Sequence, residues 1–330
     1  MDNQLRPLNL GEILDRTADL YRSRFLFFAG LASIFAAAML AVELLHLGAI
    51  RLMGYPEIAP HLAWVYAASM CMALLLISLL GGLLIAAFNR AVAWIYLGKL
   101  ATVHAAVSSI FAKAGRYLWL MTLTMVRAWG PLIGVYILFF GILIAAGFGG
   151  AMFSPGAAHQ PAEIGPGAIA GALIGIVVTG LLLIPALVYG VFMSLRYSLA
   201  MPACVVEGLP AAGAIRRSIA LSEGSRGRIF VLGLLVGVVR LMLGLLVEFP
   251  MIVFAVKHLG QPIPLGWMVY QQFGVFAMNT LIGPIYSIGL TLFYYDQRIR
   301  KEGYDIEWMM QAAGLLPQQA ASELGGASLN

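Results

Sequence analysis

The stretch RSRFLFFAGLASIFAAAMLAVELLHLG, residues 22–48, sets the class of this protein. Two arginines precede an apolar run that is long enough to cross the hydrocarbon core of a bilayer, which takes about 20 helical residues. Further apolar runs of similar length follow along the chain. The predicted spans cover residues 26–48, 66–90, 118–150, 167–195, 229–256 and 271–295.

The composition also indicates a membrane protein. Apolar residues make up 61% of the 330-residue chain and charged residues 11%, whereas soluble domains have roughly half apolar and a quarter charged residues. Lipid offers no partner to backbone amides, and the runs lack the two-residue alternation of a barrel strand, so each span is predicted to be an α-helix. We therefore predict an all-α integral membrane protein with six transmembrane helices.

Positive charge is sorted between the two sides of these spans. One side carries nearly every Lys and Arg, while the other carries only Arg51 and Lys257, and residues 152–167 carry none. Such asymmetry in short loops orients membrane proteins with the basic side in the cytoplasm. The sequence predicts a bacterial inner-membrane protein with both termini in the cytoplasm, and its net charge of +5 follows from this sorting.

The basic segments carry apolar residues at helical spacing. Residues 10–25, 103–114 and 214–221 show this pattern before the first, third and fifth spans, and it is typical of amphipathic helices that lie in the headgroup layer. We expect three repeats of an interfacial helix followed by two spans, unless the match reflects only features that all spans share. The third run is long, and we expect it to begin as an interfacial helix and to cross from near Pro131.

This pattern gives a simple domain layout. The predicted parts are an N-terminal amphipathic segment (1–25), a membrane domain (26–300) and a cytoplasmic C-terminal tail (301–330).

Three motifs carry a resemblance to a known family. They are RPLNLGEILDRTADLYRSRF (6–25), VVEGLPAAGAIRRSIALSEGSRGRIF (205–230) and YYDQRIRKEGYDIEWM (294–309). Together they resemble the glycerophosphoryl diester phosphodiesterase membrane-domain family and related bacterial multi-pass proteins. Some relatives fuse this membrane part to a phosphodiesterase barrel, which needs about 250 residues. This chain has no room for that barrel, so the resemblance implies fold and location but no enzymatic activity.

A cluster of arginines at the fifth span is the first candidate site. Several arginines beside a membrane bind anionic headgroups, each contributing about 1 kcal/mol. The alternative is that they serve only to orient the spans. The members are Arg216, Arg217, Arg226 and Arg228.

Polar residues inside the spans are the second candidates. A cation deep in hydrocarbon costs from about 3 to more than 10 kcal/mol, so Arg127 and Arg240 are expected either to line an anion or lipid-headgroup site or to snorkel or pair with a carboxylate. Glu43 and Glu248 are interpreted as interfacial or arginine-paired groups rather than a proton or cation relay. Asn279 is interpreted as a hydrogen-bond partner of a neighbouring helix.

No catalytic, metal or cofactor motif is found, and basic and aromatic residues do not interleave as in a nucleic-acid interface. We predict a non-enzymatic membrane protein that acts as a scaffold or a lipid-interacting module, with anionic lipids as partners. The alternative is a transporter or channel for an anionic or lipid-like substrate. An intramembrane lipid enzyme is a third possibility, which would require catalytic groups that converge only in the folded chain.

Overall fold

The structure is a computed structural model that describes residues 6–55, 62–145, 166–304, 306 and 310. Every regular element in this part of the chain is helical. The end of the third predicted span, residues 146–150, and most of the predicted C-terminal tail lie outside the described residues.

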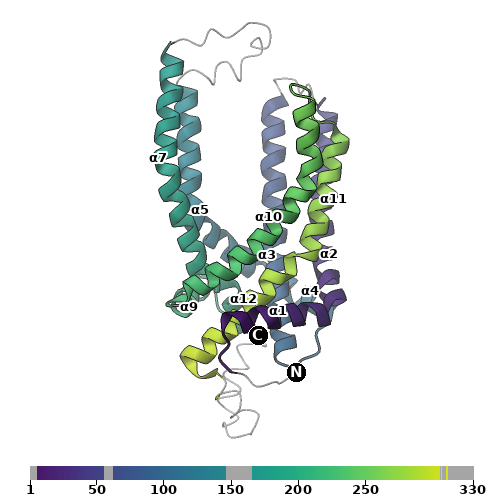
Figure 1. Cartoon of the computed structure of the whole chain (residues 1–330), viewed down its shortest axis with the longest axis vertical. Coiled ribbons are helices and arrows are strands. Elements are labelled where there is room, and N and C mark those ends of the chain that lie inside the picture. Colours follow the sequence, from purple (N-terminus) through teal and green to yellow (C-terminus); the bar gives the residue numbers. More distant parts are fainter. Residues whose placement is uncertain (1–5, 56–61, 146–165, 305, 307–309, 311–330) are drawn as a thin grey trace. The chain divides into compact units, whose positions relative to one another are not determined.

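The long helices follow the predicted spans (Figure 1). They are α2 (Phe25–Leu52), α3 (Ala63–Tyr96), α5 (Ala114–Ala145), α7 (Pro166–Tyr197) and α10 (Arg226–Lys257). The sixth span comprises α11 (Leu265–Leu281) and α12 (Gly283–Glu302). Six helical segments of the described chain are long and apolar enough to cross a membrane, which confirms an all-α multi-pass membrane protein. Helix α5 continues as one helix through Pro131, and the expected interfacial start of the third run stays a prediction.

Short helices precede three of the spans. They are α1 (Leu10–Ser23) before α2, α4 (Val103–Phe111) before α5, and α9 (Ala211–Ser222) before α10, and a further short helix, α8 (Ala200–Glu207), precedes α9. The first helix starts with a capping box, in which Asn9 and Glu12 each accept a backbone N–H of the other at 2.8 Å. The helices agree with the expected order of elements, while the threefold repeat and the interfacial location stay predictions.

The break between α11 and α12 has a local cause and a specific partner. Pro284 lies in the first turn of α12 and has no N–H to donate, and the amide of Ile285 donates to Ile282 rather than to Leu281. The hydroxyl of Tyr21 on α1 donates to the carbonyl of Leu281 instead. Burial raises the pKa of Tyr21, so its hydroxyl remains a donor at neutral pH.

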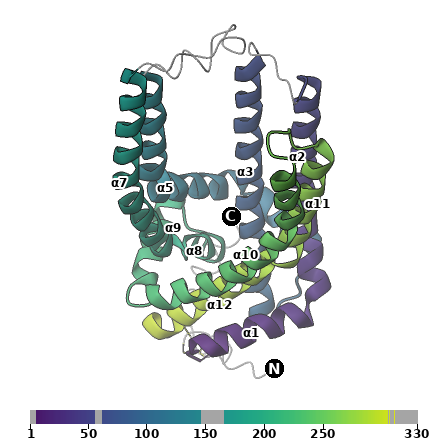
Figure 2. The ribbon, with the colours of Figure 1, turned by 45° about the horizontal axis from the view of Figure 1, so that its top comes forward.

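The chain divides into two compact units. Unit 1 comprises Met1–Leu45, Leu75–Met121 and Leu195–Asn330, and unit 2 comprises His46–Leu74 and Thr122–Ser194. The core of unit 1 is α12, in which every residue from Ser287 to Gln297 is buried. Helix α1 packs along it, as Figures 1 and 2 both show.

Polar and aromatic contacts fix α12 to the second half of α3 within unit 1. The buried hydroxyl of Thr291 donates to the side-chain oxygen of Asn89 at 2.7 Å. Farther along, the rings of Tyr96 and Tyr295 lie 4.9 Å apart. These contacts select one position of α12 along α3, since apolar packing between helices would allow several.

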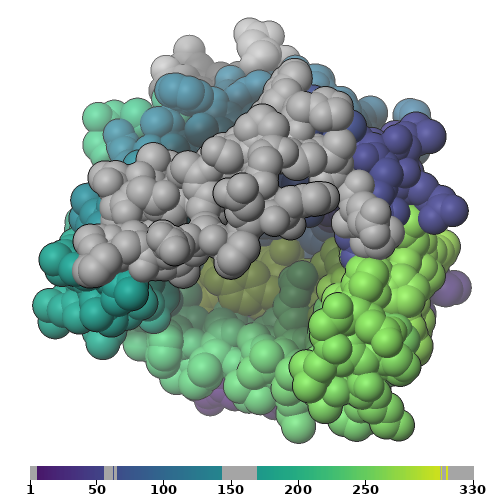
Figure 3. Space-filling model, turned by 90° about the horizontal axis from the view of Figure 1, so that it is seen from above, coloured from purple at the N-terminus to yellow at the C-terminus, as the bar shows by residue number. Residues whose placement is uncertain are grey.

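Helices α10 and α11 also pack closely within unit 1. The backbone of Gly274 on α11 lies against the side chain of Val247 on α10, where a β-carbon would not fit. Their shared end forms one continuous surface in Figure 3 (green). A small residue at such a contact lets the backbones approach each other.

Unit 2 depends on a similar contact between α5 and α7. A β-carbon at Gly190 would lie 2.9 Å from the ring of Trp129 and 3.3 Å from the carbonyl oxygen of Ala128. Nearer the start of α7, the side chain of Ile142 lies 3.2 Å from the position of a β-carbon at Gly175. Glycines at positions 167, 171 and 175 form a GxxxG spacing in the sequence of α7. This spacing includes Gly175 but not Gly190.

Gly190→Ala should destabilise unit 2, because the added methyl group forces α5 and α7 apart. We expect a cost of about 1–3 kcal/mol, the usual range for overpacking, measured as a lower melting temperature in detergent. Gly180→Ala is the matched control on the same helix, because no atom lies within 4 Å of its β-carbon position. Equal melting temperatures for the two variants would contradict the packing described for Gly190.

Candidate functional site

A buried carboxylate on α12 holds the N-terminal segment of the chain. The side chain of Asp296 is fully buried and accepts hydrogen bonds from the backbone N–H of Leu8 at 2.8 Å, from Arg228 at 3.2 Å and from Arg300 at 3.0 Å. The carbonyl of Leu8 in turn accepts from Arg228 at 3.0 Å and from Arg300 at 2.7 Å. The peptide groups on both sides of Leu8 are therefore held by one charged cluster, which we call the Asp296 cluster.

A second charged cluster lies on the other face of the same helix end. Glu207, the last residue of α8, accepts from Arg217 at 2.9 Å and from the hydroxyl of Tyr294. Arg217 also donates to Glu302 at 2.7 Å, and Arg298 donates to Glu302 at 3.2 Å. We call these residues the Glu207 cluster, in which two glutamates are balanced by two arginines.

The electrostatics of the Glu207 cluster favour its charged form. Burial alone would lower the pKa of Arg217, but hydrogen bonds to Glu302 and Glu207 outweigh it and raise this pKa above its ordinary value. Arg217 is thus a permanent part of the cluster at physiological pH. A lysine could not serve both glutamates in the same way, since it lacks the planar fork of the guanidinium group.

The predicted headgroup arginines have different surroundings in the structure. Arg217 and Arg228 both form ion pairs with carboxylates in unit 1, and Arg228 shares its partner Asp296 with Arg300. Arg216 is exposed on α9, and Arg226 is half-buried at the start of α10. The role of all four residues at lipid headgroups stays a prediction.

An apolar groove runs along α10 in unit 1. It has a volume of about 350 Å³ and is bounded by α10, by Tyr286 of α12 and by Leu195 at the end of α7. Its α10 residues are Ile229, Phe230, Gly233, Leu234, Gly237, Val238 and Leu241. The glycines give the groove its depth: no atom lies within 4 Å of a β-carbon position at Gly237, and the nearest at Gly233 is Tyr286 at 3.8 Å.

Arginine lies at one end of this groove. Residues three, four and seven positions apart share a helix face, so Arg226 shares a face with Ile229, Phe230 and Gly233. The groove is thus apolar along α10, and Arg226 lies one helical turn before its first α10 residues, Ile229 and Phe230.

The polar residues within the spans are paired between α10 and α11. Arg240 donates to the side-chain oxygen of Asn279 at 2.9 Å, and Glu248 accepts from the amide of Gln271 at 2.6 Å. Asn279 therefore bonds a neighbouring helix, as expected. In the described part of the chain neither Glu43 nor Glu248 pairs with an arginine, and at Glu248 the amide of Gln271 takes that place.

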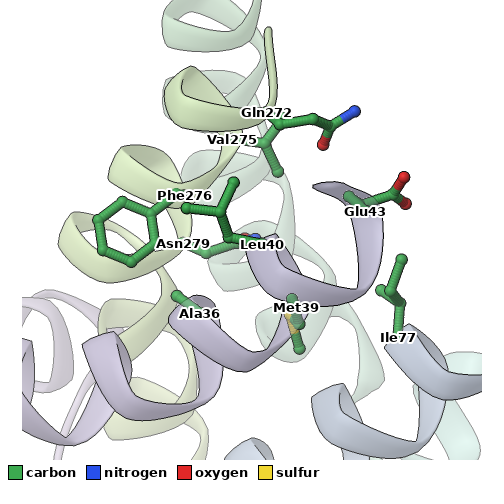
Figure 4. A pocket seen from close by; sticks show the side chains of 9 residues that line it. All are labelled: Ala36, Met39, Leu40, Glu43, Ile77, Gln272, Val275, Phe276 and Asn279. Atoms are coloured by element: carbon green, nitrogen blue, oxygen red, sulfur yellow. The ribbon is translucent and has the colours of Figure 1, made fainter. Parts of the chain in front are cut away.

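Two predicted residues stand apart from these pairs. Arg127 is exposed on α5 in unit 2 and makes no hydrogen bond or ion pair with the residues that the structure describes. Glu43 faces a small pocket in unit 1 that is also lined by Gln272 and Asn279 (Figure 4). Neither Arg127 nor Arg240 lines this pocket or the groove.

Sequence reasoning did not identify the acidic members of the clusters. Asp296 and Arg300 are four residues apart, as are Arg298 and Glu302, and this spacing is the signal for pairs on a helix surface. In the sequence these four residues stand only within the third family-like motif, residues 294–309. Carboxylates on the basic side of a membrane protein are a signal that some arginines there form ion pairs.

No group of three His, Cys, Asp or Glu side chains that could hold a metal occurs among the described residues. Comparisons with protein families, with characterised proteins and with solved structures find no match to this chain. The resemblance of its three motifs to a membrane-domain family therefore stays a prediction.

Asp296→Asn should weaken the attachment of the N-terminal segment, because the neutral amide cannot compensate two arginines and also accept from Leu8. We expect a loss near the lower end of the about 3–5 kcal/mol that breaking a buried ion pair costs, since both arginines keep access to solvent. Thermal unfolding in detergent measures the loss. Hydrogen exchange should show faster exchange at the Leu8 amide.

The control for this variant is Asp15→Asn, which changes an exposed carboxylate on α1 and should leave both readings unaltered. If Asp296→Asn melts like the unsubstituted protein and keeps Leu8 protected, the Asp296 cluster does not hold the segment.

Proposed function

We propose that this chain is a non-enzymatic multi-pass membrane protein that binds an anionic phospholipid in the groove of α10. The observation that carries the proposal is the continuity of the groove with Arg226. Such a protein serves as a lipid-interacting module or as a scaffold whose binding of partners depends on the lipid composition of the membrane.

The size and surface of the groove support an acyl chain as its occupant. Its volume of about 350 Å³ is roughly twice that of an engineered cavity that binds benzene. Leu234 and Leu241 are more than half exposed along it. A chain lying over the glycines would cover these side chains and would contact the ring of Tyr286.

The magnitudes suggest which part of the lipid is selected. Acyl chains are as apolar as leucine side chains, so transfer of a chain from bulk lipid to the groove brings little hydrophobic gain. A basic residue at the membrane surface contributes about 1 kcal/mol toward an anionic headgroup. Selection should therefore come from the arginine end, with Arg226 and the exposed Arg216 as the leading groups.

The proposed location is a bacterial inner membrane with both termini in the cytoplasm. Its support is the charge sorting of the sequence and the resemblance of the three motifs to bacterial membrane proteins. Under this orientation the two clusters and Arg226 lie at the cytoplasmic surface, where anionic lipids create a negative potential.

A second candidate function is transport. The small pocket at Glu43 favours it, because a purely structural scaffold does not need a pocket lined by a carboxylate and two amides. The pocket and the groove lie in the same unit and share no lining residue. Both include residues of the sixth span.

Gly237→Leu should abolish lipid binding in the groove, because leucine fills the space without meeting the backbone. We expect native mass spectrometry of the detergent-purified protein to show one retained phosphatidylglycerol fewer than in the unsubstituted protein. Gly141→Leu on α5 is the matched control, since its β-carbon position is equally open. Equal lipid retention in the two variants would overturn the proposal.

Arg226→Gln tests the headgroup part of the same proposal. Loss of about 1 kcal/mol corresponds to a preference for phosphatidylglycerol over phosphatidylethanolamine that is about fivefold lower. Competition between the two lipids in nanodiscs measures this ratio. Arg127→Gln removes an exposed arginine from unit 2 and should leave the ratio unchanged; a fall of the same size in both variants would show a general charge effect instead of a site.

A further inference from the structure

The pocket at Glu43 is built from matching faces of two helices. Helix α2 contributes Ala36, Met39, Leu40 and Glu43, and α11 contributes Gln272, Val275, Phe276 and Asn279. In both sets the positions are i, i+3, i+4 and i+7, which form one face of a helix. Ile77 of α3 completes the wall. The pocket therefore lies between two helical turns of α2 and two helical turns of α11.

Three polar side chains line this pocket among apolar ones. Figure 4 shows the carboxylate of Glu43 and the amide of Gln272 extending to the same side. Asn279 lines the space and its side-chain oxygen accepts from Arg240. Two amides and one carboxylate thus border a volume of about 80 Å³.

The carboxylate of Glu43 has no ion pair or hydrogen bond with any described residue. It lies nine residues before the end of α2 at Leu52, or about 14 Å along the helix, which is inside the hydrocarbon when α2 spans the bilayer. A charged side chain at such a depth costs several kcal/mol unless something compensates it. The pocket is the space in which that compensation can occur.

The neighbouring charges do not provide it. On α10, Arg240 is bound to Asn279 and Glu248 is bound to Gln271, and α11 carries no charged residue. Ile77 lies more than three turns from the nearest charged residue of α3, Arg90. His46 is one turn beyond Glu43 on α2. The nearby fixed charges are therefore one arginine and two glutamates, so the site retains a net negative charge.

We propose that Glu43 and Gln272, beside Asn279, form a binding site for Na⁺. This inference does not depend on the lipid groove. A single cation neutralises the carboxylate, and the amide oxygen of Gln272 supplies the kind of ligand that a hard cation prefers. A divalent ion would leave excess positive charge in hydrocarbon. The volume also accommodates water, which can complete the coordination of Na⁺.

Carbodiimide labelling tests this site in the unsubstituted protein. Dicyclohexylcarbodiimide is apolar and reacts with protonated carboxyl groups: the carboxyl oxygen bonds to the central carbon, the proton goes to nitrogen, and an acyl shift leaves a stable N-acylurea. Glu43 is half-buried, so the reagent reaches it from the lipid side. The readout is the ratio of labelling at Glu43 to labelling at Glu248, determined by peptide mass spectrometry.

The proposal predicts that Glu43 is labelled and that the ratio depends on the cation. If the site takes Na⁺, the ratio falls severalfold when Na⁺ replaces choline at constant pH. A ratio that responds to pH but not to Na⁺ reflects only the ordinary protonation of a carboxyl group and would contradict the proposal.

Two outcomes would overturn the proposal. One is a failure of Glu43 to react at any pH, and the other is a ratio that does not change with Na⁺. Glu43→Gln should remove the labelled peptide and so confirms the assignment. Gln272→Leu should raise the Na⁺ concentration of half-protection by about tenfold, since it removes one oxygen ligand.

Discussion

The requirement that a bilayer cover apolar side chains governs this structure. Helices α5, α7 and α10 expose large apolar residues over most of their length, and Ile137, Val188 and Leu241 are each more than 60% exposed. Water would not tolerate apolar patches of this extent. In lipid the same surface costs nothing, provided that every backbone group is satisfied within a helix. The rest of the architecture follows from where polar groups can be placed under that condition.

Polar groups are placed in two ways. At the end of α12, charged residues form two clusters that attach α8, α9, α10 and the N-terminal segment to one helix. Within the spans, amides bond the charged residues of α10. The exposed Arg216, the groove end near Arg226 and the carboxylate of Glu43 carry the proposals for lipid and cation binding.

The sequence predicted the helical class, the number of spans and the short helices before α2, α5 and α10, because these depend on local periodicity and on apolar length. It did not predict the partners of Asp296 and Glu207, which lie up to 288 residues away along the chain. Helix α12 is buried in unit 1 because other helices surround it, and the apolar run of its first half does not reveal this burial. A pocket such as that at Glu43 requires two helix faces to meet, which no single stretch reveals.

Single-cysteine labelling in sealed membrane vesicles tests the central claim most directly. With Cys71 and Cys204 replaced by serine, one cysteine is introduced at Arg24, Lys99 or Arg216, or at Arg51 or Gln261, all of which are exposed. A membrane-impermeant maleimide should label the first three positions from one face only and the last two from the opposite face only. Labelling of both groups from the same face would contradict a chain whose helices cross the bilayer in alternate directions.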